Sequence, residues 1–148
     1  MSNFVFTLEK VLNYRMSVEK AARQAVTEAQ ERYDLNKRIL DEMYKSYEGG
    51  LVQDDAGVEI SWVIRQNNYR LYLAKCIERQ QELLSGIQDE IHERRDKLIR
   101  AWRERSVLEK VREKSFSRHQ LEEKNKEKFQ NDETGQSTFV YHKRGQLL

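Results

Sequence analysis

Residues 77–101, IERQQELLSGIQDEIHERRDKLIRA, decide the fold. Two sets of residues repeat in this stretch at seven-residue intervals: Ile77, Leu84, Ile91 and Leu98, and between them Gln80, Ile87, Arg94 and Ala101. Alternating steps of three and four are typical of a helix that buries a narrow seam against another helix. The surrounding residues 58–130 contain no proline and one glycine, Gly86. A helix of that length would reach roughly 110 Å, so it needs a partner helix along its side.

The composition favours a rod over a globule. Of the 148 residues 35% are charged and 38% are hydrophobic, so the buried core must be thin. The net charge of +2, from 27 basic and 25 acidic residues, argues against a surface built for nucleic acid. Positive charge is concentrated in residues 92–119, where ten Lys or Arg accompany five Asp or Glu. The single cysteine, Cys76, excludes an internal disulfide, and no long apolar run predicts direct membrane insertion, so we expect a soluble cytoplasmic protein.

The residues before this stretch predict the partner helix. A seam of threes and fours, with one additional step of four near Ala29, passes through Leu8, Val11, Arg15, Val18, Ala22, Ala25, Ala29, Tyr33, Asn36, Leu40, Met43 and Tyr47. Gly49 and Gly50 end this helix. We therefore predict one all-α domain over residues 1–133, a long antiparallel two-helix coiled-coil hairpin. Helix one covers about 7–48, a loop 49–58, a longer helix two about 59–130, and a flexible tail 134–148.

The turn also predicts a register. If it centres near residue 53, Ala29 faces Ile77 and Phe4 faces Trp102, and Gly86 either permits close helix contact or marks a bend. Helix two would then project alone beyond about Arg105, where its seam becomes polar.

Catalytic motifs are absent from the sequence. No glycine-rich loop with a following Lys-Ser/Thr could bind phosphates. His92 has helical spacing to Asp89 and Asp96, but a solvated ion pair is the expected arrangement there. A two-helix rod also offers no dry pocket in which to shift a pKa. We expect no enzymatic activity, no cofactor and no metal.

Two surface features indicate binding. The first is a cluster near the hairpin turn: Leu40, Met43, Tyr44, Tyr47, Trp62, Tyr69, Tyr72, Leu73 and Cys76. It is either an exposed protein-binding patch or an internally packed splay of the helices. The second is the terminal end, where basic and aromatic residues mix: Phe4, Phe6, Lys10, Arg15, Arg95, Trp102, Arg103, Arg105, Leu108, Lys110 and Arg112. It is either a surface for an acidic partner or a solvated face with internal ion pairs.

The order of several short motifs resembles the flagellar export protein family FliJ. Phe6-x-Leu8-Glu9-Lys10-Val11-Leu12-x-x-Arg15, followed by Glu19 and Ala21-Ala22-Arg23, is similar to its N-terminal signature. The segment from Trp102 to Lys114, and Glu122-Glu123-Lys124 through Asp132-Glu133, is similar to its C-terminal signature. The resemblance spans about residues 4–133.

The resemblance implies a stalk and adaptor of the flagellar type III export apparatus, similar to the stalk of a rotary ATPase. The expected partners are the hexameric export ATPase, the membrane export gate and export chaperones, at the cytoplasmic face of the flagellar base. ATPase binding is expected at Phe6, Lys10, Arg15, Trp102, Arg105, Leu108, Lys110 and Arg112. Gate binding is expected at Asn36, Leu40, Met43, Tyr47, Tyr69, Leu73, Cys76 and Gln80. The alternatives are the equivalent stalk of an injectisome and a generic structural coiled coil that dimerises.

Overall fold

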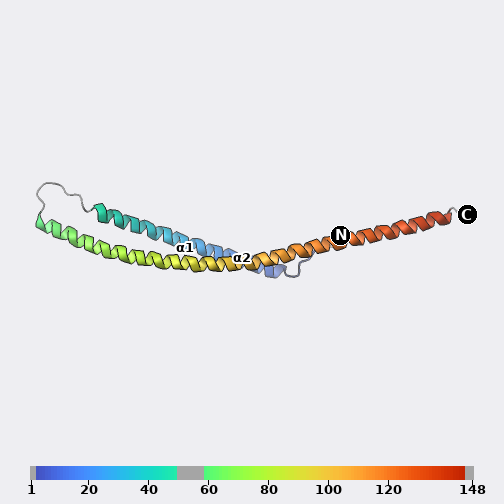
Figure 1. Ribbon diagram of the computed structural model, residues 1–148, viewed down its shortest axis with the longest axis horizontal. Coiled ribbons are helices and arrows are strands. Elements are labelled where there is room, and N and C mark those ends of the chain that lie inside the picture. Colours follow the sequence, from blue (N-terminus) through green and yellow to red (C-terminus); the bar gives the residue numbers. More distant parts are fainter. Residues whose placement is uncertain (1–2, 50–58, 146–148) are drawn as a thin grey trace. The chain divides into compact units, whose positions relative to one another are not determined.

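The fold is a hairpin of two helices. The computed structural model describes residues 3–49 and 59–145, in which α1 spans Glu9–Gly49 and α2 spans Ile60–Gly145 (Figure 1). The predicted all-helical hairpin with a longer second helix is confirmed. The loop was predicted at residues 49–58. Gly49 is the last residue of α1, and residues 50–58 lie outside the described ranges.

Helix α2 continues to Gly145, beyond the end predicted near residue 130. In this extension the hydroxyl groups bond within the helix, because Ser137 donates to the Glu133 carbonyl at 2.9 Å and Thr134 donates to the Gln130 carbonyl. The sequence contains no proline to stop the helix, and its last turn carries His142, Lys143 and Arg144, which suit a helix C-terminus. The flexibility expected of residues 134–148 stays a prediction.

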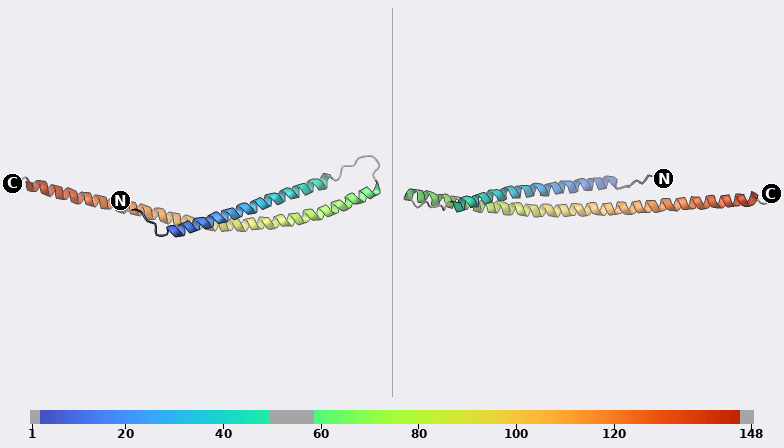
Figure 2. Two further views of the ribbon diagram at one scale, coloured as in Figure 1. Left: turned by 180° about the vertical axis from the view of Figure 1, so that it is seen from behind. Right: turned by 90° about the horizontal axis from the view of Figure 1, so that it is seen from above.

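The chain divides into two units. The loop-side unit is Val18–Ala101, and the terminal unit combines Met1–Ser17 with Trp102–Leu148. In the loop-side unit α1 and α2 lie side by side in both views (Figures 1 and 2). The helices are antiparallel there, because Asn36 pairs with Gln80 and the earlier Ala25 with the later Arg94.

The core of the loop-side unit is the predicted α2 seam. One cluster joins Leu40 of α1 to three buried residues of α2: Leu73, Ile77 and Leu84. Tyr33, Met43 and Tyr47 of α1 pack against this cluster. A second cluster joins Ala29 to Ile87 and Ile91. The seven-residue spacing in α2 therefore identified the buried positions correctly.

The seam of α1 is more regular than predicted. Its buried and half-buried residues include one unbroken heptad series: Leu12, Arg15, Glu19, Ala22, Val26, Ala29, Tyr33, Asn36, Leu40, Met43 and Tyr47. Glu19 is 5% exposed and forms an ion pair with Arg23 at 2.9 Å. Leu8 and Val11, which were predicted to lie in the seam, are exposed. The additional step of four near Ala29 is therefore unnecessary. A carboxylate at a core position concealed the true series, because charged residues are seldom buried.

The predicted register is wrong by roughly two heptads. Ala29 clusters with Ile87 and Ile91, not with Ile77, and Arg32 pairs with Glu90 at 2.7 Å. Heptad seams coincide after every shift of seven residues, so their coincidence could not select one register. Gly86 is not required for a close approach either, because a Cβ built there meets nothing within 4 Å.

The terminal unit follows the same shift. Phe4 contacts Phe116, with ring centroids 5.3 Å apart, and His119 at 5.6 Å, although the sequence register placed it against Trp102. Arg15 pairs with Glu104, and Arg112 with Glu9 at 3.3 Å. The expectation that α2 projects alone beyond about Arg105 is therefore wrong. Within this unit, α2 has no described helix beside it after about the level of Arg112, which pairs with Glu9 at the beginning of α1; this part is orange to red in Figures 1 and 2.

Candidate functional site

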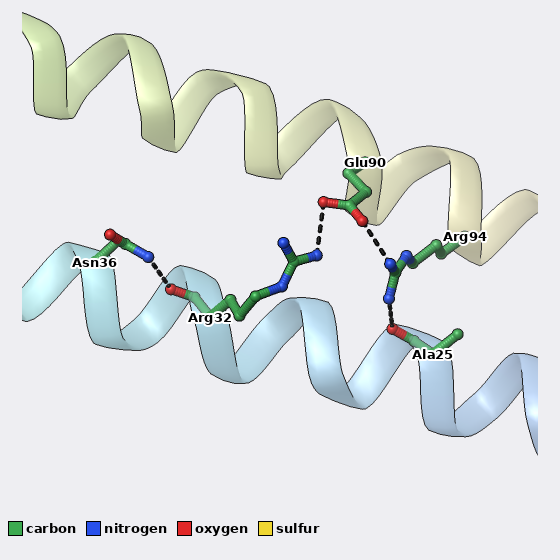
Figure 3. Close-up of polar contacts among 5 residues, drawn as sticks. All are labelled: Ala25, Arg32, Asn36, Glu90 and Arg94. Carbon is green, nitrogen blue, oxygen red and sulfur yellow. Dashed lines mark hydrogen bonds and ion pairs between the residues drawn. The ribbon is translucent and has the colours of Figure 1, made fainter.

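A polar network links the helices in the middle of the loop-side unit (Figure 3). Glu90 of α2 accepts from Arg32 of α1 at 2.7 Å and from Arg94 at 2.5 Å, and Arg94 also donates to the Ala25 carbonyl at 2.6 Å. The hydrogen bond from Arg32 is the main cause that lowers the pKa of Glu90. This network fixes the register where the apolar seam is interrupted.

The residues expected to bind the export gate come together in the loop-side unit, but many face inward. Leu40 and Leu73 are 5% and 7% exposed and lie in one core cluster, against which Met43 and Tyr47 pack. Gln80 donates to both the carbonyl and the side-chain oxygen of Asn36, each at 3.0 Å. Of the two arrangements that the sequence left open for the cluster near the turn, internal packing holds for Leu40, Leu73, Met43 and Tyr47.

Tyr69 and Cys76 differ from the rest of that set. Tyr69 is exposed and Cys76 is half-buried. The neighbouring Tyr72 is also exposed, and its hydrogen bond with the Cys76 thiol is the main cause that raises the pKa of its phenol. Arg70 lies over the ring of Tyr47, 4.7 Å from its centroid. Within the predicted gate-binding set, the residues accessible to a partner therefore lie on α2, beside the exposed Tyr72.

Sequence reasoning missed two residues of this surface. Trp62 belongs to the predicted cluster but not to the predicted gate-binding set, and Leu83, exposed on α2, belongs to neither. A signal was available, because Trp62, Tyr69, Cys76 and Leu83 also follow at seven-residue intervals. This series is harder to recognise than that of Ile77 and Leu84, because its members are of mixed residue types.

The residues expected to bind the ATPase all lie in the terminal unit, in three environments. Phe6 is buried and Leu108 is half-buried. Three arginines form ion pairs with glutamates of the same unit: Arg15 with Glu104, Arg105 with Glu109 at 2.6 Å, and Arg112 with Glu9. The exposed members are Lys10, Trp102 and Lys110. Among the described residues, no ion-pair partner lies against either lysine.

A hollow of about 330 Å³ lies near the start of the chain in the same unit. Its walls are formed by Phe4 and one face of α2, which includes Phe116, His119 and Glu123. Within the described ranges no group of three or more His, Cys, Asp or Glu is placed to hold a metal ion. Neither described helix contains a segment long and apolar enough to cross a membrane.

The comparisons give one family. A family model described as "Flagellar FliJ protein" matches residues 4–144, nearly the whole sequence. No match was found among the curated proteins or among the solved structures.

Proposed function

This chain belongs to the flagellar FliJ family, and on that premise we propose that it is a non-enzymatic stalk and adaptor of the flagellar protein export apparatus. Membership implies a component of that apparatus located at the cytoplasmic side of the flagellar base. The finer proposal is that the chain inserts into the hexameric export ATPase, promotes its assembly and activity, and links it to the membrane export gate. Export chaperones are further proposed partners.

Exposed side chains of the terminal unit support the ATPase part of the proposal. Trp102 is 50% exposed, and Lys10 and Lys110 lie on the same unit without ion-pair partners among the described residues. An exposed tryptophan and two exposed lysines on one unit suit an acidic protein surface with an apolar pocket. This combination is the single observation that carries the proposal.

The paired arginines have a different proposed role. Arg15, Arg105 and Arg112 already neutralise glutamates of their own unit, so meeting an acidic partner would require them to exchange one carboxylate for another. We assign Arg15 and Arg112 first to holding the beginning of α1 against α2, whereas Arg105 pairs within α2 itself. Phe6 and Leu108, buried and half-buried, would support the surface from beneath.

The gate part of the proposal centres on the exposed aromatic side of α2. Tyr69 and Cys76 are accessible, whereas Leu40 and Leu73 lie between the helices. Direct contact is therefore assigned to Tyr69 and Cys76. The others would hold α2 in position: Asn36, Leu40, Met43, Tyr47, Leu73 and Gln80.

The test is ATP hydrolysis by the purified export ATPase with and without the full chain. The wild-type chain should bind the ATPase and raise its activity. Replacing Trp102→Ala together with Lys110→Glu should weaken binding by about tenfold or more, because an aromatic anchor and a charge contact are lost together. Circular dichroism should show unchanged helicity, because both residues are exposed.

A matched control truncates another exposed aromatic residue and reverses another lysine elsewhere in the terminal unit. Phe139 and Lys143 are exposed near the end of α2, with the Lys143 ammonium 5.5 Å from the Phe139 ring centroid. Phe139→Ala with Lys143→Glu should retain stimulation. Equal stimulation by both double variants would remove the proposed site, and no binding of the wild-type chain would remove the proposed function.

A further inference from the structure

Helix α2 carries a second heptad series on its exposed side. Seven residues of the loop-side unit follow one another in steps of three and four: Trp62, Arg65, Tyr69, Tyr72, Cys76, Arg79 and Leu83. We refer to this set as the outer seam. Steps of three and four place side chains along one face of a helix, about 32 Å long for residues 62–83.

The outer seam is separate from the seam that holds the hairpin together. The residues that contact α1 are Leu73, Ile77, Leu84 and their companions, and these are buried. The outer seam is accessible: Tyr72 is 65%, Leu83 49% and Trp62 36% exposed. Single exposed apolar residues are common, but a series with strict heptad spacing indicates a place for a further helix.

The charges of the outer seam indicate what kind of helix fits. Its two charged members, Arg65 and Arg79, are exposed, and neither forms an ion pair with a described residue. Arginines along the contact between α1 and α2 behave differently, since Arg32 and Arg94 of the same unit both pair with Glu90. The outer seam therefore combines aromatic anchors with two arginines, two heptads apart, that form no ion pair with a described residue.

A second copy of the same seam is a poor occupant. In an antiparallel pair centred on Tyr72, Arg65 of one copy would face Arg79 of the other, and in a parallel pair each arginine would face its counterpart. Like charges placed together at a helix interface oppose association. The favoured occupant has the opposite charge.

We propose that the outer seam binds an acidic amphipathic helix of a partner protein as a third helix against α2. Trp62 and Tyr69 are its aromatic anchors, because such side chains supply much of the energy of helix docking. Carboxylates two heptads apart on the partner meet Arg65 and Arg79. The outer seam shares Tyr69 and Cys76 with the proposed gate surface, but the proposal needs neither the ATPase nor the gate.

The experiment uses the full chain and two synthetic peptides. Both have four heptads with leucine along one face, and they carry at the flanking positions either glutamate or lysine. Binding is measured by fluorescence anisotropy of the labelled peptide and by the rate at which Cys76 reacts with a thiol reagent. The glutamate peptide should bind and slow the reaction of Cys76 severalfold, because that thiol lies within the outer seam.

Charge reversal makes the test specific. Arg65→Glu with Arg79→Glu should weaken binding of the glutamate peptide by about tenfold or more and should allow the lysine peptide to bind. The control, Lys45→Glu with Lys75→Glu, makes the same change in net charge at exposed positions outside the outer seam and should leave binding unchanged. Circular dichroism establishes that each variant remains helical.

Three results would overturn the proposal. The first is failure of the glutamate peptide to bind the wild-type chain. The second is equal binding to the outer-seam variant and the control. The third is a dimer in sedimentation that dissociates on Trp62→Ala, which would assign the seam to a second copy. Loss of ATPase stimulation with normal peptide binding would instead concern the proposed function alone.

Discussion

The two units of the hairpin use one heptad repeat with different side chains. In the loop-side unit the α2 seam is largely aliphatic, with Ile77, Leu84 and Ile87 each 7% exposed or less. In the terminal unit the continuing positions are mostly polar: Arg105, Leu108, Arg112, Ser115 and His119. Spacing sets which positions face the partner helix, and residue type sets how strongly they hold it.

The difference implies that the two units contribute unequally to the stability of the hairpin. Exposed or half-exposed ion pairs contribute little to stability, whereas each buried leucine or isoleucine contributes a few kcal/mol at most. The loop-side unit should therefore carry most of the stability of the hairpin. The terminal unit is held by ion pairs and by Phe4, Phe6 and Leu12, so its helices should separate more readily when a partner competes for them.

The largest expected effect comes from truncating the aliphatic seam. Leu84→Ala should lower the free energy of unfolding by about 2–3 kcal/mol, because it leaves a cavity between the helices. Leu108→Ala, at a half-buried position of the terminal unit, should cost less than about 1 kcal/mol. Urea unfolding followed by circular dichroism measures both. Equal losses would show that the two units do not differ in the proposed way.

A smaller effect is expected from acid. The pKa of Glu90 is lowered in the folded chain. The charged carboxylate therefore stabilises the fold fully at pH values above its ordinary pKa of about 4.5, and this contribution is lost as the pH falls through the lowered pKa. Glu90→Gln should therefore flatten the dependence of unfolding free energy on pH below about 4.5. The comparison is a set of urea titrations of both proteins from pH 7 to pH 3. Identical slopes would mean that Arg32 and Arg94 do not stabilise the charged form.

Much of the fold could be predicted from the sequence because aliphatic residues mark α2 clearly. Ile77, Leu84 and Ile91 needed no coordinates to be placed inward. The register could not be predicted, because the sequence of residues 50–58 and of the first turns of α2 does not show which residue of α2 is the first to face α1. In α1 the buried Glu19 concealed one core position and introduced an irregularity that is absent.

The candidate surfaces were predicted less well for a related reason. A sequence shows that Arg15 and Arg112 are basic but not that Glu104 and Glu9 lie beside them, because those pairs depend on the register. The same holds for Leu40 and Leu73, whose apolar side chains suggest a binding surface but pack in one core cluster. Trp102, Lys110 and Tyr69 differ from these residues because they are exposed to solvent. Which residues are exposed can be known only once the packing of the two helices is known.

The register is the central claim, because it decides which side chains remain for partners. It can be measured by disulfide formation in a chain whose only thiol is removed by Cys76→Ser. Cysteines introduced at positions 29 and 87 should cross-link rapidly under mild oxidation, because Ala29 and Ile87 share one core cluster. Cysteines at 29 and 77, the pair that a turn centred near residue 53 would bring together, should not. Rapid cross-linking of 29 with 77 and not of 29 with 87 would contradict the register, and with it the assignment of exposed surfaces.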